Sequence, residues 1–377
     1  MAYSTPGVYI EEIEMGARPI EGVSTSTVGF VGVAEKTVEK PKPIFISSWS
    51  NFESSFGGYT ATAQYLAPAV YAFFANGGKR CYVVGVEKET DIIGSDINGT
   101  RTGLQSLKEI DDVSIVVVPG MSDKTTQDAM IAHCEDMGDR FCILDSKEGD
   151  GLDEIIAQKN GLMSSDKGVG ALYYPWIRMS ASKTLWEKRF IPPSGAVAGV
   201  YARSDSQRGV HKAPANEVLR GVVELERAIT NNDQGPLNDE NINCIRAFKG
   251  RGIRIWGART IAPKGSSWKY INVRRLFLYI EESIDESTQW VVFEPNNEQL
   301  WARVTQTINN FLLGVWKSGA LMGTNPKEAF FVKCDRTTMT EGDINNGRLI
   351  AIIGIAPTKP AEFVIFQITQ WTANSDN

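Results

Sequence analysis

The chain has 377 residues, 42% of them hydrophobic and 22% charged, and its formal net charge at pH 7 is −6. This balance is typical of a soluble globular protein of two or three domains, and the acidic excess argues against nucleic-acid binding. No apolar run reaches the ~20 residues that cross a bilayer, and no signal-peptide pattern opens the sequence, so we expect synthesis in the cytoplasm without membrane insertion. The five cysteines include no Cys-x-x-Cys pair, which predicts buried, reduced thiols rather than disulfides or a zinc site.

Residues 1–22 have the pattern of an arm rather than of a core segment. A Pro6-Gly7 turn signal precedes a short β-branched and aromatic run, which predicts a strand. The sequence offers this strand no evident partner. The residues that we assign to it are Val8, Tyr9, Ile10 and Glu11.

Residues 23–221 alternate between strand and helix patterns. Such alternation requires crossover connections, so we expect an α/β domain with a mostly parallel sheet. Ser50 or Asn51 is the expected N-cap of a short helix that ends at Gly57. Gly195 and Gly199 fall inside a helix, where they indicate close packing. The expected strands are 23–33, 44–46, 81–86, 113–118, 141–144 and 171–174, and the main expected helices are 62–76, 104–110, 125–137, 152–162 and 192–201.

Residues 222–358 form a second block, which we interpret as an α+β domain. Strands are expected at 242–248 and 253–258, joined by a turn, and again at 330–334 and 348–355. Helices are expected at 274–287 and 297–318. The longer helix carries an apolar stripe that predicts its buried face. The residues of this stripe are Leu300, Trp301, Val304, Ile308, Phe311, Leu312 and Val315.

Residues 359–377 form a second candidate arm. Its β-branched and aromatic residues, set off by Pro360, again predict a strand without an evident partner. An edge strand exposes N–H and C=O groups that invite another chain, so a strand at each terminus indicates strand donation between subunits. Two terminal strands that complete their own subunit's sheet are the alternative. The residues assigned to the C-terminal strand are Phe363, Val364, Ile365, Phe366, Gln367 and Ile368.

The sequence offers little chemistry for catalysis. His133 lies beside Cys134 on one helix, where adjacent side chains do not face each other, so they do not predict a catalytic pair. We interpret His211 as structural, with a contact to a partner chain as the alternative. No phosphate-binding loop occurs. The acidic cluster 281–286 is interpreted as a solvated or partner-facing helix face. We therefore predict no catalytic, cofactor-binding or metal-binding residue, and no enzyme.

Ordered segments over almost the whole chain resemble the contractile tail sheath proteins. Near the start these segments are Pro6-Gly7-Val8-Tyr9-Ile10-Glu11-Glu12, Gly22-Val23-Ser24-Thr25-Ser26-Thr27, Gly29-Phe30-Val31-Gly32 and Phe73-Phe74-Ala75-Asn76-Gly77-Gly78. In the second block they are Ile253-Arg-Ile-Trp256-Gly-Ala-Arg259-Thr260, Trp268-Lys-Tyr-Ile-Asn272-Val-Arg274-Arg275, Trp290-Val-Val-Phe293-Glu-Pro295-Asn296 and Leu300-Trp301. The short chain is most similar to sheaths of extracellular contractile injection systems and tailocins.

The resemblance implies an outer α/β domain (23–221), an inner α+β domain (222–358) and two strand-exchange arms (1–22 and 359–377). It implies stacked hexameric rings of this chain around an inner tube protein, with baseplate and terminal cap proteins, and sheath paralogues, as further partners. Contraction of such a sheath drives the tube through a target envelope, and no cofactor or nucleic acid is implied. The particle would assemble in the bacterial cytoplasm, as part of a phage tail or a released tail-like particle.

An inner sheath domain must also contact the tube. We hypothesise that the helix 297–318 faces the tube through Arg303 and Lys317, together with the loop at Lys327; solvated side chains are the alternative. Two other functions are weighed against the contractile sheath. One is a non-contractile shell, tail or cap assembly protein with the same arms, and the other is an α/β enzyme with a small-molecule site at its strand ends.

Overall fold

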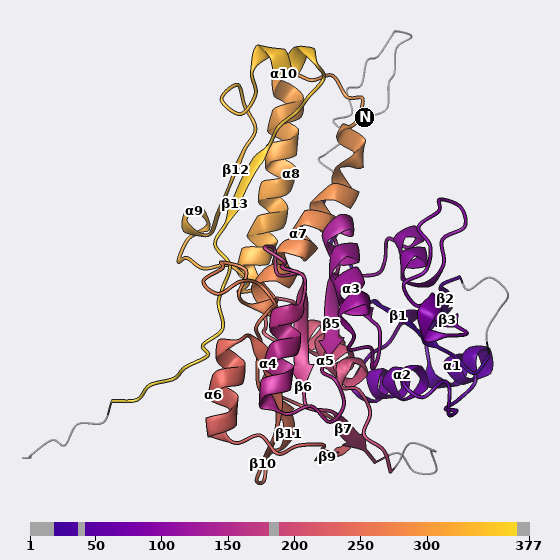
Figure 1. Ribbon diagram of the computed structural model, residues 1–377. Helices are drawn as coiled ribbons and strands as arrows, with labels where there is room; N and C mark the ends of the chain where they lie inside the picture. The colour runs from indigo at the N-terminus through magenta and orange to yellow at the C-terminus, as the bar shows by residue number, and fades with distance from the viewer. Residues whose placement is uncertain (1–18, 37–41, 181–187, 368–377) are drawn as a thin grey trace, which may run out of the picture.

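The computed structural model describes residues 19–36, 42–180 and 188–367 (Figure 1). Its α/β body contains a sheet of nine strands in the order β2-β3-β1-β4-β5-β6-β10-β11-β8. The six central strands run parallel, and the outer strands β2, β11 and β8 run antiparallel to their neighbours. The strands are β1 Val28–Val33, β2 Ile44–Ile46, β3 Cys81–Val86, β4 Ile115–Val117, β5 Phe141–Asp145, β6 Gly170–Tyr174, β8 Glu217–Val218, β10 Ile242–Phe248 and β11 Gly252–Ile255.

Helices cover both faces of this sheet because its central strands are apolar on both sides. One core lies beneath α1, α2 and α5, and a second lies beneath η2, α3 and α4. Alternate side chains of one strand pack into the two cores: in β1, Phe30 lies in the first core and Val31 in the second. The helices of the body are α1 Trp49–Phe56, α2 Leu66–Ala75, η1 Glu89–Asp91, η2 Gly103–Glu109, α3 Lys124–Met137, α4 Leu152–Gly161, α5 Ser194–Arg208 and α6 Asn231–Asp239. A small separate sheet pairs β7 Ile177–Met179 with β9 Val222–Leu225.

The glycines of α5 allow the backbones of α5 and α2 to touch, as the sequence predicted. A Cβ at Gly195 would lie 2.2 Å from the carbonyl oxygen of Ala69, and one at Gly199 would lie 2.4 Å from that of Phe73. Such contacts are below any van der Waals distance, so only glycine fits at both positions.

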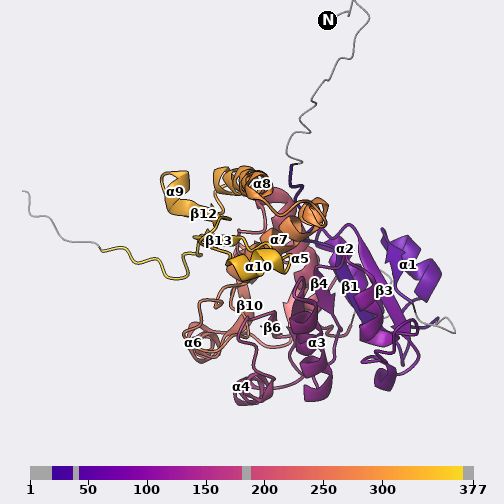
Figure 2. The same ribbon diagram turned by 90° about the horizontal axis from the view of Figure 1, so that it is seen from above.

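A helical part follows the body and projects from it as an elongated hairpin of helices (Figures 1 and 2). Helix α8 packs its predicted apolar stripe against α7 and against one face of a two-stranded sheet, with Phe311 only partly buried. The elements of this part are α7 Ile271–Thr288, η3 Gln289–Val291, α8 Glu298–Lys317, α9 Pro326–Ala329, β12 Phe330–Lys333, α10 Glu341–Asn345 and β13 Ile352–Ile355. Helix α8 begins at Asn297, whose Oδ1 accepts a hydrogen bond from the N–H of Leu300.

The main sheet continues across the expected boundary between residues 221 and 222. Strand β10 pairs in parallel with β6, so the sheet continues through residue 255. The division into an outer and an inner domain stays a prediction. One local expectation was wrong, because the N-cap of α1 is Ser48 rather than Ser50 or Asn51. Helix α6 was not expected from the sequence.

A buried ion pair joins the helical part to the body. Arg275 of α7 donates two hydrogen bonds to the carboxylate of Asp205 on α5, at 3.1 and 2.7 Å, and a third to the carbonyl oxygen of Thr25. The hydroxyl of Thr25 also donates to Asp205, at 2.7 Å. The guanidinium lies over the ring of Tyr201, 4.7 Å from its centroid. One charged cluster therefore connects α5, α7 and the segment that leads into β1.

We predict that Arg275→Ala lowers the free energy of unfolding by about 3–5 kcal/mol, because it leaves the carboxylate of Asp205 buried without its cation. The two side chains are only 3% and 5% exposed. Chemical denaturation monitored by circular dichroism would measure the loss. Arg348→Ala is the matched control, because that arginine is 62% exposed in its pair with Asp343, and it should cost less than about 1 kcal/mol. Equal effects of the two substitutions would contradict the prediction.

Candidate intersubunit interface

The chain that precedes the C-terminal arm is strapped to the rest of the subunit. Thr358 donates from its N–H and its hydroxyl to the carbonyl oxygen of Ala320, at 3.0 and 3.1 Å. The amide of Asn272 in turn donates to the carbonyl oxygen of Thr358. The N–H of Met322 donates to the carbonyl oxygen of Ala356, and Pro357 forms a bridge with Leu321. These contacts fix the direction from which the arm departs.

Glu362 makes the last strong contact before the arm leaves the body. Arg259 donates to both of its carboxylate oxygens, at 2.7 and 2.8 Å, and the hydroxyl of Tyr270 donates at 3.2 Å. Lys269 adds a second positive charge at 3.6 Å. Burial alone would raise the pKa of Glu362, but the hydrogen bonds and charge of Arg259 outweigh burial and hold this pKa below its ordinary value of 4.5. Glu362 is therefore a charged anchor for the arm.

Beyond this anchor, the described chain leads away from the body (Figures 1 and 2). Residues 363–367 form neither helix nor strand within the subunit. Four consecutive apolar side chains are exposed there: Phe363 by 72%, Val364 by 66%, Ile365 by 82% and Phe366 by 84%. Such a run is unfavourable in water unless another surface covers it. Gln367 ends the described residues, while Ile368 and the N-terminal candidates Val8, Tyr9, Ile10 and Glu11 lie outside them.

The helical part carries a small antiparallel sheet of β12 and β13, paired from Phe330 opposite Ile355 to Lys333 opposite Ile352. In the described part of the chain no third strand joins it, so each of its two strands has one open edge. Its inner face packs on α8 through Phe330, Val332 and Ile355. The sheet is therefore a rigid platform with unused main-chain groups.

The outer face of this platform is exposed and mainly apolar, with Lys333 opposite Ile352 as its charged residue. Phe331 is 56% exposed, and Ile352 is 48% exposed. The ring of Phe331 lies across Gly354 on the opposite strand, so that a Cβ at Gly354 would fall 2.1 Å from a ring carbon. Glycine at this position thus lets the ring lie flat on the platform. An added strand would find an apolar surface there, next to an open edge.

The three tube-facing candidates do not lie together. Arg303 is near the start of α8, where its guanidinium stacks 4.6 Å from the ring of Trp290 and lies 4.0 Å from Glu294. Lys317 is exposed at the other end of α8, roughly 21 Å away at 1.5 Å per residue. Lys327 is exposed on α9, which lies beside the C-terminal half of α8 (Figure 1). The structure therefore groups Lys317 with Lys327 and leaves Arg303 apart.

The carboxyl end of β5, where α/β folds often bind ligands, is occupied by structural contacts. Asp145 is buried there, which raises its pKa to about 6. Its carboxylate accepts hydrogen bonds from the N–H of Gly120 and from the N–H and hydroxyl of Ser194, so it ties β5 to the start of α5. His133 is buried in α3, and burial, with the charges of Arg140 and Lys108, lowers its pKa to about 3.

A search of the described ranges found no group of three or more His, Cys, Asp or Glu side chains placed to hold a metal ion. Over those ranges, too, none of the helices is both long and apolar enough to cross a membrane.

Family models of phage tail sheath proteins match most of the chain. The model of the phage tail sheath protein central domain matches residues 94–261, and that of the phage tail sheath C-terminal domain matches residues 263–370. The N-terminal domain of DUF2586 matches residues 16–142. The two sheath models meet between β11 and α7, where the main sheet has ended.

Curated relatives are tail sheath proteins. That of Burkholderia phage BcepMu is 29% identical over 63% of this chain, and the matched stretch spans 55% of the relative. The match to the sheath protein of Vibrio phage KVP40 spans only 28% of that relative. The prophage major tail sheath protein of Pseudomonas aeruginosa strain UCBPP-PA14 is 24% identical, and the match covers 97% of both chains.

Solved sheath structures share the fold over the full length. The PVC sheath complex of an extracellular contractile injection system, in its contracted state, has a TM-score of 0.83, 34% identity and 98% coverage of both chains. The contracted helical sheath of the anti-feeding prophage has a TM-score of 0.80 and 33% identity, covering 98% of this chain and 100% of that one. The chain belongs to the contractile tail sheath family, whose members are structural proteins and not enzymes. The resemblance seen in the sequence and the expected mixed fold are thereby confirmed.

We predict that Glu362→Gln loosens the base of the C-terminal arm. Hydrogen bonds to charged groups contribute about 1.5–3 kcal/mol, so amide hydrogen exchange in residues 356–362 should accelerate roughly 10- to 100-fold. Because the folded pKa of Glu362 is lowered, the anchor should be complete above pH 4.5 and lost as the pH falls through that lowered value. Glu53→Gln, at an exposed position on α1, should leave this exchange unchanged. Unaltered exchange in the Glu362 variant would refute the anchoring role.

Proposed function

We propose that this chain is the repeating subunit of a contractile sheath whose subunits are joined by strand exchange. The proposal rests on the presence, in one subunit, of a segment suited to donate a strand and a sheet suited to accept one. The donor is the exposed apolar run 363–366, and the acceptor is the platform of β12 and β13. Full-length similarity to two contracted sheaths supports the same function.

Strand exchange suits these two segments physically. An added strand satisfies the main-chain groups at an open edge, while alternate side chains set its register. Val364 and Phe366 would share one face of such a strand and could cover the apolar outer face of the platform. Main-chain pairing tolerates changes in the angle between subunits, as contraction requires. We extend the proposal to Val8, Tyr9, Ile10 and Glu11 as a second donor, and to Gln367 and Ile368 as the continuation of the first.

The finer features of the proposal follow the family. Subunits would stack as hexameric rings around an inner tube protein, with the α/β body outward, and contraction would drive the tube through a target envelope. Lys317 and Lys327 are the better tube-facing candidates, because Arg303 is engaged by Trp290 and Glu294. Baseplate and cap proteins would bind the ends of the sheath. A chain in the six-fold symmetrised baseplate structure of the anti-feeding prophage is also similar to this chain, which supports a contact with the baseplate.

We also propose that the two domains divide near residue 262. A boundary there keeps the main sheet intact and separates the α/β body from the helical part. The particle would be a phage tail or a phage tail-like particle assembled in the bacterial cytoplasm.

We predict that removal of residues 363–377 abolishes polymer formation and leaves a folded monomer. The double substitution Val364→Asp and Phe366→Asp should act similarly at full chain length, because it places charge on one face of the donor strand. Negative-stain electron microscopy and sedimentation would show striated tubes from the full chain only. Removal of residues 372–377 alone is the control and should preserve the tubes. Polymers formed by the aspartate variant would contradict strand donation, and tubes that never shorten would indicate a non-contractile assembly.

We predict that Gly354→Ala weakens the polymer without destabilising the subunit. The added Cβ displaces the ring of Phe331, and since this ring is 56% exposed the displacement should cost less than about 1 kcal/mol. The critical concentration for polymer formation, measured by sedimentation, should rise. Gly161→Ala is the control, because a Cβ at this exposed position at the end of α4 meets nothing within 4 Å. An unchanged critical concentration would exclude the outer face of the platform from assembly.

A further inference from the structure

The hairpin that joins β10 to β11 is strongly basic in an otherwise acidic protein. Four cations, Arg246, Lys249, Arg251 and Arg254, occur within nine residues that contain no carboxylate. Lys249 and Arg251 are exposed at the tip. We call residues 246–254 the basic hairpin. Its position at the end of β10 places it at the carboxyl edge of the parallel strands.

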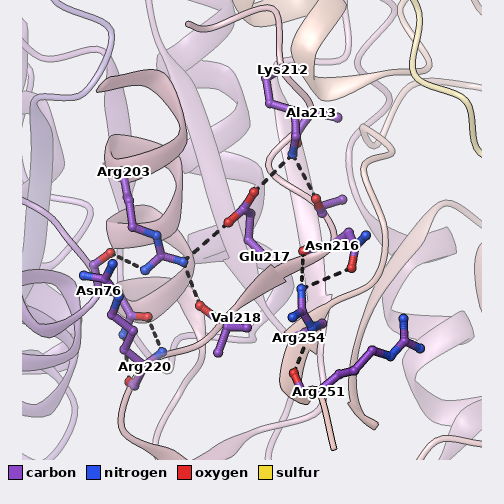
Figure 3. Close-up of polar contacts among 11 residues, drawn as sticks. Asn76, Arg203, Lys212, Ala213, Asn216, Glu217, Val218, Arg220, Arg251 and Arg254 are labelled. Carbon is purple, nitrogen blue, oxygen red and sulfur yellow. Dashed lines mark hydrogen bonds and ion pairs between the residues drawn. The ribbon is translucent and has the colours of Figure 1, made fainter. Parts of the chain in front are cut away.

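The arginines of the basic hairpin bond to neutral groups instead of carboxylates. Arg254 donates to the carbonyl oxygens of Arg251 and Asn216, at 2.9 and 2.7 Å, whereas the side chain of Arg251 points away from the other labelled residues (Figure 3). Arg246 donates to the carbonyl oxygen of Ile229 and to Gln234. Across the described ranges, none of the four cations forms an ion pair.

The nearby carboxylate Glu217 is already engaged. It lies 3.4 Å from Lys212 and 3.8 Å from Arg203, on the side away from the hairpin tip (Figure 3). Arg203 and Lys212 also donate to backbone carbonyl oxygens, including those of Asn76 and Ala215. Asp233 lies near Arg246 without forming an ion pair with it. Within the described ranges, the positive charge of the basic hairpin is therefore without a directly paired carboxylate.

Aromatic rings hold two of these arginines in place. Phe248 and Trp256 lie with their ring centroids 4.5 Å apart. The guanidinium of Arg251 is 4.6 Å from the Phe248 centroid and 5.8 Å from that of Trp256, and Arg246 is 5.3 Å from Phe248. Because these cations are already ordered, docking them on a partner would lose less conformational entropy than docking free side chains.

The complementary surface is an acidic cleft on the same chain. It lies where α7 meets the loops before β4 and β5, and five of its lining residues are carboxylates. These residues, which define the acidic cleft, are Asp111, Asp112, Asp139, Glu282 and Glu286.

The negative charge of the acidic cleft is largely unbalanced. Of its carboxylates only Asp139 pairs with a described cation, the buried Arg140, and Arg275, which also lines the cleft, pairs with Asp205. Burial, together with the nearby carboxylates of Asp139, Glu286, Asp285 and Asp111, raises the pKa of Glu282 to about 7. A cation from outside the subunit would relieve this repulsion.

The two surfaces cannot meet within one subunit. The acidic cleft lies at the amino ends of β4 and β5, and the basic hairpin lies at the carboxyl end of β10, which runs parallel to them through β6. The length of β10 alone, roughly 23 Å at ~3.3 Å per residue, separates the amino ends of the strands from the basic hairpin. The two unlike patches lie at opposite ends of the strands. A contact between them in neighbouring copies is therefore head-to-tail, and such a contact repeats along a helical polymer.

We propose that the basic hairpin of one subunit docks on the acidic cleft of a neighbouring copy of this chain. This contact rests on the proposed function, since it requires a polymer of the chain. It is independent of the strand-exchange arms, because it uses the α/β body and α7. It supplies charge pairing between subunits and leaves the main-chain exchange of the arms unaffected.

The contact can be tested with a zero-length carbodiimide cross-linker on the full chain. A polymer formed from mixed ¹⁴N- and ¹⁵N-labelled protein should give a mixed-isotope cross-link between Lys249 and Asp112 or Glu286. Lys249→Arg keeps the charge but removes the amine, so it should abolish this cross-link alone. The pair of Lys264 and Glu240, 2.7 Å apart within one subunit, is the internal positive control. Detection of the Lys264 cross-link without that of Lys249, in assembled or concentrated protein, overturns the proposal.

Charge reversal gives a second, functional test. Lys249→Glu with Arg251→Glu, or Asp112→Lys with Glu286→Lys, should each raise the critical concentration for polymer formation at least tenfold. All four residues are exposed, so thermal unfolding should change little. Combining the two reversals in one chain should restore most of the assembly. The docking is overturned if the combined variant does not recover assembly. It is also overturned if the hairpin reversal raises the critical concentration and the cleft reversal does not.

These outcomes separate the inference from the proposed function. A wild-type chain that forms no polymer under any condition refutes the proposed function and, with no Lys249 cross-link, the docking as well. A wild-type polymer that is indifferent to both reversals refutes only the docking. Loss of binding to a labelled DNA duplex by the hairpin reversal, with normal polymer formation, would assign the basic hairpin to nucleic acid instead.

Discussion

The arrangement of the subunit depends on the buried ion pair between Asp205 and Arg275. Helix α5, which carries the aspartate, is fixed to α2 through backbone contacts at Gly195 and Gly199, and so belongs rigidly to the sheet. Arg275 transfers that rigidity to α7, while Thr25 brings the entry to β1 into the same cluster. A buried charge without its partner is unfavourable by several kcal/mol, so the three segments keep one relative position. The platform of β12 and β13 is in turn held by α8 against α7.

The sequence predicted the parallel sheet well, because doubly buried strands such as Cys81–Val86 appear as short apolar runs between helical patterns. The expected boundary after residue 221 stays a prediction, but the main sheet continues past it through a pairing that the sequence did not reveal. Strand β10 pairs with β6, where Ile242 lies opposite Leu172, and no local sequence pattern predicts a pairing between segments so far apart in the chain. Helix α6 escaped detection because Gly235 and Pro236 lie inside it, although the capping box of Thr230 and Asp233 marks its start.

The candidate interface was predictable only in part. The apolar composition of 363–366 indicated a strand. Within the described subunit these residues form no strand, and their donation to another chain stays a prediction. The anchor of the arm was not visible, since Arg259 and Glu362 are 103 residues apart. Nor could the local sequence show that β12 and β13 pair and leave their edges open. The acidic residues 281–286 were interpreted as a solvated or partner-facing helix face, but the proximity of Glu282 and Glu286 to Asp111 and Asp139 is visible only in the fold.

The main sheet and the platform of β12 and β13 differ in the length of their edge strands. The nine-stranded sheet ends at one side in β8, which has two residues, and at the other in β2, which has three and follows Pro43. Edges so short present too few main-chain groups to template another chain. The small platform, in contrast, offers four-residue strands with an apolar face. The short edges of the larger sheet disfavour off-pathway association there. Under the proposed strand exchange, a newly made subunit would remain unassembled until its platform meets a donor strand.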